Sequence, residues 1–126
     1  MYSLGTKSKQ RLVGVHADLV QVVERAIEIT TVEFAVIEGL RTPERQKALR
    51  DAGASKTLNS RHITGHAVDL GALIDGEVRW DWPLYHKIAS AMKEAAKECN
   101  VPIVWGGDWR TFKDGPHFEL DRRIYP

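Results

Sequence analysis

A strand-like segment with a carboxylate on one face is the feature that most constrains this 126-residue chain. Residues 67–74 read Ala-Val-Asp-Leu-Gly-Ala-Leu-Ile, and alternate side chains of a strand point to opposite faces. Val68 and Leu70 therefore share a core-directed face, whereas Asp69 lies on the other face beside very small residues. Because a buried, unpaired carboxylate is costly, Asp69 requires a cation or a cluster of hydrogen-bond donors.

The strand-like segment 116–120 repeats this pattern with a histidine. His117 and Glu119 share one face, opposite an apolar face. His62, which shortly precedes Asp69, is a third candidate ligand. Zinc accepts imidazole and carboxylate ligands, and a catalytic zinc keeps a fourth position for water. A histidine in a strand is more often simply hydrogen-bonded, so the pattern alone leaves a metal site and ordinary buried histidines as alternatives.

The remaining sequence predicts helices and short strands around these two segments. Apolar residues at helical spacing predict a helix over 18–30, and Thr42 followed by Pro43 marks the start of another. Asp75-Gly76 is a strong signal for a hairpin turn. We expect a polar, loosely ordered arm (1–14), a long loop (53–66), helices over 18–30, 42–52 and 83–99, and strands over 32–40, 67–74, 77–80, 102–105 and 116–120.

Length, charge and cysteine content exclude several classes of protein. A chain of 126 residues fits a single domain, 1–126. Its 18 basic and 17 acidic residues give a formal net charge of +1, so no broad basic surface is expected for nucleic acid. Cys99 is the single cysteine, which excludes an intramolecular disulfide and a thiolate-rich zinc site. Without a signal-peptide pattern or a membrane-length apolar stretch, we expect synthesis in the cytoplasm and no stable membrane association.

Two motifs in this sequence resemble those of a known enzyme family. Residues 60–70, Ser-Arg-His-Ile-Thr-Gly-His-Ala-Val-Asp-Leu, resemble the Ser-x-His-x-x-Gly-x-Ala-x-Asp signature of zinc D-alanyl-D-alanine carboxypeptidases and dipeptidases of the vancomycin-resistance type. Residues 105–120 resemble the second metal motif of that family, and Arg41 matches the arginine that precedes both motifs. The resemblance covers nearly the whole chain. It is greatest to the phage and prophage endolysins of the family, which are L-alanyl-D-glutamate endopeptidases.

The resemblance implies a site and a fold. It implies an α+β fold with a small antiparallel sheet flanked by helices, the D-Ala-D-Ala carboxypeptidase or hedgehog-like zinc peptidase fold. One zinc ion per chain would be held by His62, Asp69 and His117. Asp114, where many relatives have glutamate, would be the catalytic general base. Arg41 would be catalytic by steadying the carbonyl oxygen, or would bind a substrate carboxylate.

Other residues near these motifs are weaker candidates. Arg41 has an alternative role as an ordinary salt-bridge partner of Glu38 or Glu44. We expect Ser60 to bind substrate by hydrogen bonding, and Trp105 to form part of the cleft wall together with Trp109. Two residues after His117, Glu119 is expected to support that ligand or to have a structural role.

The function implied by the resemblance is that of an endolysin. We expect a zinc-dependent, monomeric hydrolase that cleaves the L-Ala–D-Glu bond of bacterial peptidoglycan stem peptides and so lyses the host cell. It would be made in the host cytoplasm and reach the wall through a holin-type lesion. One alternative is a D-alanyl-D-alanine carboxypeptidase that trims terminal D-alanine. An alternative of another class is a non-catalytic, metal-stabilised module that binds the cell wall.

Overall fold

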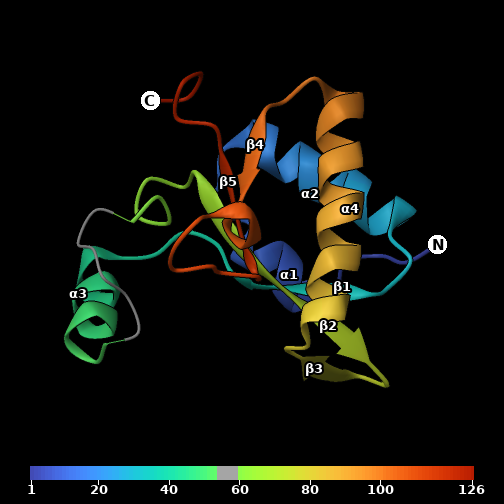
Figure 1. The fold of residues 1–126 in the computed structure, drawn as a ribbon, viewed down its shortest axis with the longest axis horizontal. Helices are drawn as coiled ribbons and strands as arrows, with labels where there is room; N and C mark the ends of the chain where they lie inside the picture. Colours follow the sequence, from blue (N-terminus) through green and yellow to red (C-terminus); the bar gives the residue numbers. More distant parts are fainter. Residues whose placement is uncertain (54–59) are drawn as a thin grey trace.

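A computed structural model describes residues 1–53 and 60–126, so the expected loop 53–66 lies partly outside the described residues. Figure 1 shows one small sheet with α2 and α4 on one side and α3 on the other, which confirms the α+β class. The elements are α1 (Thr6–Arg11), α2 (Ala17–Ile29), β1 (Phe34–Glu38), α3 (Pro43–Asp51), β2 (Ala67–Ile74), β3 (Glu77–Arg79), α4 (Trp82–Cys99), β4 (Ile103–Trp105), the 3-10 helix η1 (Gly106–Asp108) and β5 (His117–Leu120).

The antiparallel sheet brings the polar positions of three strands together. Its order is β1-β2-β5-β4, and β3 forms a hairpin with β2. Asp69 pairs with His117 across β2 and β5, and with Glu38 across β2 and β1. The register of β1 shifts between Val36 and Glu38, and this irregularity places Glu38 opposite Asp69. Because directly paired residues project from the same face, Glu38, Asp69 and His117 lie side by side.

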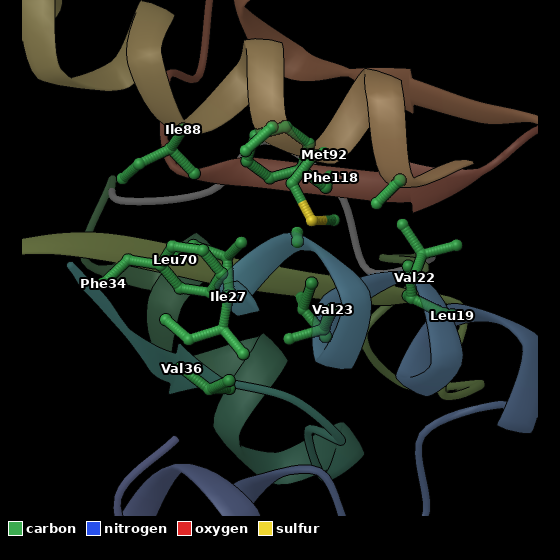
Figure 2. Packing of buried hydrophobic residues seen from close by; sticks show 14 of the residues in the cluster. Leu19, Val22, Val23, Ile27, Phe34, Val36, Leu70, Ile88, Met92 and Phe118 are labelled. Atoms are coloured by element: carbon green, nitrogen blue, oxygen red, sulfur yellow. The ribbon is translucent and has the colours of Figure 1, made fainter. Parts of the chain in front are cut away.

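Apolar side chains fix which face of the sheet these polar residues take. Helices α2 and α4 pack against each other over the opposite face. Figure 2 shows Leu70 of β2 and Phe118 of β5 gathered with Val23 of α2 and Met92 of α4, and all four side chains are fully buried. Burying each such side chain contributes about 1.5–3 kcal/mol. A slip of one residue in β2 or β5 would forfeit this burial and move the polar residues into the core.

The start of α3 and the turn between β2 and β3 form where local sequence signals predicted them. The Thr42 hydroxyl accepts a hydrogen bond of 3.1 Å from the Arg45 amide, and Pro43 occupies the first position of α3. The turn between β2 and β3 has left-handed backbone at Asp75 (φ 53°) and Gly76 (φ 81°). Positive φ at both central residues is what a type I′ hairpin requires, which is why Asp-Gly predicted it.

The expectation of a loosely ordered arm over 1–14 is wrong. This segment contains α1, and its Leu4, Ser8 and Leu12 are buried. The Ser8 hydroxyl accepts a 2.9 Å hydrogen bond from the Val36 amide, and Arg11 Nη1 donates one of 3.0 Å to the Val36 carbonyl. Polar side chains of α1 thus satisfy the outer edge of β1, which would otherwise be open to pairing with another chain.

No helix in the described part of the chain is both long and apolar enough to cross a membrane.

Candidate metal centre

The side chains of Asp69 in β2, His117 in β5 and His62 in a turn converge on one point at the polar face of the sheet. Asp69 Oδ1 lies 3.2 Å from His62 Nε2 and 3.3 Å from His117 Nδ1. One candidate ligand atom from each of the three residues lies within 4.8 Å of the other two. Both histidines are buried, and Asp69 is partly buried. The structure therefore brings together the three residues predicted as ligands.

The second nitrogen of each histidine has a partner of its own. His62 Nδ1 lies 2.9 Å from the Gly39 carbonyl oxygen, which can only accept, so this nitrogen donates. His117 Nε2 lies 2.9 Å from Glu119 Oε1, so the two side chains are in the contact that the expected support of His117 requires. These contacts leave His62 Nε2 and His117 Nδ1 as the nitrogens that face Asp69. Metal-binding histidines are typically oriented by such outer hydrogen bonds.

The charges around the three residues favour a cation. Burial would raise the pKa of Asp69, but hydrogen bonds from His117 and His62 lower it well below its usual range. Burial would lower the pKa of His117, yet its hydrogen bonds to Asp69 and Glu119 raise it to about 9. In the metal-free protein His117 thus holds a proton between the carboxylates of Asp69 and Glu119. A metal ion fits the same position, because these donors are the nitrogen and oxygen ligands that zinc accepts.

Asp114 is held beside the cluster by a tight turn. Its amide donates a 3.0 Å hydrogen bond to the Gly106 carbonyl, and its carbonyl accepts one of 3.2 Å from the His117 amide. A side chain at Gly106 would overlap the Asp114 carbonyl, so the close approach requires glycine there. Burial, and next the charge of Asp69, raise the pKa of the Asp114 carboxyl. Such a carboxylate accepts a proton more readily than an exposed aspartate does.

Arg41 forms the salt bridge with Glu38 that the sequence offered as one of its roles. It is buried and forms a two-pronged ion pair with Glu38, at 2.8 Å from Nε and 2.7 Å from Nη2. Nη1 donates to Gln46 Oε1 at 2.6 Å, and Nη2 lies 3.7 Å from Asp69 Oδ2. The salt bridge with Glu38 therefore exists, and it fixes the guanidinium at the edge of the cluster.

A cleft of about 550 Å³ opens over these residues. Ser60 lines it, and its hydroxyl accepts a 3.2 Å hydrogen bond from the His62 amide. Trp109, which the sequence had marked, also lines the cleft. The lining residues that the sequence did not mark are Leu49 and Arg61, Phe112 and Lys113 from the segment before Asp114, and Arg122 near the end of the chain. No periodicity marks this irregular segment, so only its position before Asp114 could have drawn attention to it.

The expectation that Trp105 forms the cleft wall is wrong. Trp105 is buried, stacks on Phe118 in the core, and is absent from the cleft lining. Its Nε1 donates a 2.7 Å hydrogen bond to the Gly115 carbonyl. Strand β4 places Trp105 on the apolar face, so it supports the Asp114 turn from within the core. Trp109 is the tryptophan that reaches the cleft, with its ring centroid 5.1 Å from that of His117.

Two solved structures superimpose on this protein. The L-Ala D-Glu endopeptidase ChiX of Serratia marcescens superimposes with a TM-score of 0.92 at 50% identity, covering 96% of this chain and 91% of ChiX. The vancomycin-resistance D,D-dipeptidase VanXYg superimposes with a TM-score of 0.58 at 21% identity, over 84% of this chain and 50% of the dipeptidase, and this likeness concerns the fold alone.

Sequence comparison identifies the family. The L-alanyl-D-glutamate peptidase of Escherichia phage T5 is 31% identical over 129 residues, covering 98% of this chain and 93% of the phage protein. The enzyme of the same name from Listeria phage A118 is 35% identical over 98 residues, which are 78% of this chain and 34% of that protein. The profile of the phage L-alanyl-D-glutamate peptidase family matches residues 1–125. This chain belongs to the phage L-alanyl-D-glutamate peptidase family.

Proposed function

We propose that this protein is a zinc-dependent endopeptidase that hydrolyses the L-alanyl–D-glutamate bond of peptidoglycan stem peptides. The observation that carries the proposal is the cluster of His62, Asp69 and His117, in which both histidines are oriented by outer hydrogen bonds. Asp114 and Arg41 line the same cleft as this cluster. The choice of the L-alanyl–D-glutamate bond rests on family membership, and the choice of metal-assisted hydrolysis rests on the cluster.

The three ligands would leave a zinc ion one open position. When bound there, zinc would lower the pKa of a water molecule and polarise the scissile carbonyl. His62 and His117 would coordinate through Nε2 and Nδ1, the nitrogens that face Asp69.

Asp114 acts in this proposal as the general base. Its raised pKa suits a group that takes a proton from the attacking water and passes it to the departing amine. The turn that joins Asp114 to His117 holds the carboxylate beside the ligands. Retention of this acid supports an enzyme over a module that only binds the cell wall.

Arg41 acts on the carbonyl oxygen as negative charge develops there. A guanidinium has five N–H groups, and Glu38 and Gln46 accept from only part of them. The ion pair with Glu38 therefore fixes the cation without using all its donors. A charge that is already in place stabilises the transition state without reorganisation.

Mass spectrometry of the products released from purified sacculi tests the proposal. The zinc-loaded protein should create new D-glutamate amino termini, and elemental analysis should give about one zinc per chain. Loss of terminal D-alanine alone would mean a carboxypeptidase instead. Synthesis in the host cytoplasm, release through a holin-type lesion, host lysis and a monomeric state remain predictions.

A further inference from the structure

Four cationic side chains line the cleft, and three of them are engaged with acceptors of the protein. Arg41 pairs with Glu38. Arg61 Nη2 donates to the carbonyls of Leu120 and Tyr125, and Arg122 Nε lies 3.5 Å from Glu119 Oε2. Arg41 and Arg122 thus face acids of the site, and Arg61 is held by backbone carbonyls.

Lys113 is the exception among the cleft cations of residues 1–53 and 60–126. It is exposed, and no carboxylate of the described residues lies within ion-pair distance of its Nζ. It directly precedes Asp114, the proposed base, so a group bound by Lys113 lies next to the reacting bond. An exposed lysine is ordinarily solvated and of little consequence, and its place in the cleft lining is what distinguishes Lys113.

The backbone before Lys113 takes an unfavourable conformation. Phe112 has left-handed backbone, with φ of 57°, and this cleft residue is 62% exposed. This region is rarely adopted by a bulky residue, and such conformations cluster at functional sites. The left-handed residue turns the chain so that Phe112 and Lys113 both line the cleft beside Asp114.

The proposed substrate carries a group that Lys113 can bind. Glutamate has two carboxyl groups, and a peptide chain can continue through only one of them. Whichever is linked, a carboxylate remains on the residue whose amine is released by cleavage of the L-Ala–D-Glu bond. We propose that Lys113 binds this free glutamate carboxylate and thereby determines specificity for D-glutamate over its amidated form. The inference rests on the proposed function and names the part of the substrate that the cleft selects.

The test compares two peptides that differ only in the free glutamate carboxylate, which is replaced by a carboxamide in the second. Wild-type protein should cleave the carboxylate form with a kcat/KM on the order of tenfold higher, since a hydrogen bond to a charged group is stronger than one to a neutral group and is partly screened in an open cleft. Lys113→Gln should lose this preference, mainly through a higher KM for the carboxylate form. Lys113→Arg should keep it, and added salt should reduce it.

Lys87→Gln is a matched control, because Lys87 is exposed on α4 and outside the cleft lining; it should cleave both peptides as wild type does. Equal loss of both activities in Lys113→Gln would indicate a structural role and overturn the inference. Equal cleavage of the two peptides by wild type would overturn the inference alone. Failure of wild type to cleave either peptide would remove the proposed function as well.

Discussion

Replacing Glu119 with glutamine is expected to weaken zinc binding by about 10- to 100-fold while the fold persists. Glu119 touches no proposed zinc ligand atom; it acts on the far nitrogen of His117. Burial would raise the pKa of Glu119, but hydrogen bonds from His117 and then the charge of His117 lower it, so the side chain is ionised at neutral pH. The substitution keeps the size of the side chain and removes its negative charge, which faces His117 on one side and Arg61 and Arg122 on the other.

The size of the effect follows from the contacts of Glu119. Oε1 lies 2.9 Å from His117 Nε2, whereas Oε2 lies 3.7 Å from Arg61 Nε. Glutamine keeps an oxygen for His117 but no longer makes the imidazole a stronger ligand, and a 10- to 100-fold loss corresponds to about 1.4–2.7 kcal/mol. Alanine would also remove the oxygen that accepts from His117, and leaving that buried N–H without an acceptor would cost about 1–3 kcal/mol in folding free energy.

Competition with a chelator of known affinity measures the zinc dissociation constant, and thermal unfolding of the metal-free protein measures the fold. Glu94→Gln is the matched control, because Glu94 is exposed on α4 and should leave both values unchanged. Zinc binding by Glu119→Gln with wild-type affinity would refute the idea that this carboxylate tunes His117. A large drop in the melting temperature of the metal-free variant would show instead that its role is structural.

Three further predictions concern the same site. Asp114→Asn should still bind one zinc ion but lose at least about 100-fold in kcat, and a variant with normal turnover would remove Asp114 from the mechanism. Because metal-free His117 keeps its proton up to about pH 9, zinc binding must displace that proton; apparent zinc affinity, measured by chelator competition, should therefore rise by up to about tenfold per pH unit below about pH 9 and then level off, and a flat profile would contradict this. Gly106→Ala should lose about 1–3 kcal/mol in denaturant unfolding, because the added methyl overlaps the Asp114 carbonyl, and unchanged stability would show that the turn yields freely.

The metal cluster could be predicted because its signals are local. Val68 and Phe118 are core residues on strands of period two, and that alone fixes the faces of Asp69 and His117. The family resemblance then favoured His62 as the third candidate ligand. The Asp75-Gly76 turn was equally local, since its backbone needs little from the rest of the chain.

The errors lie where contacts between distant segments decide. Residues around Ser8 are polar and lack a long apolar period, and only the edge of β1, which is distant in the sequence, makes them a docked helix. Trp105 was misplaced because the register of a three-residue strand sets its face, and a tryptophan suits a cleft wall as well as a core.

The central claim is that zinc is held by His62, Asp69 and His117, with each histidine using the nitrogen that its outer hydrogen bond leaves open. A crystal structure of the zinc-loaded protein, with anomalous data from both sides of the zinc absorption edge, tests it most directly. We predict one zinc ion at about 2.0–2.1 Å from His62 Nε2 and His117 Nδ1 and about 2.0–2.2 Å from an Asp69 oxygen. Zinc at another place, or coordination through His62 Nδ1 or His117 Nε2, would contradict the claim.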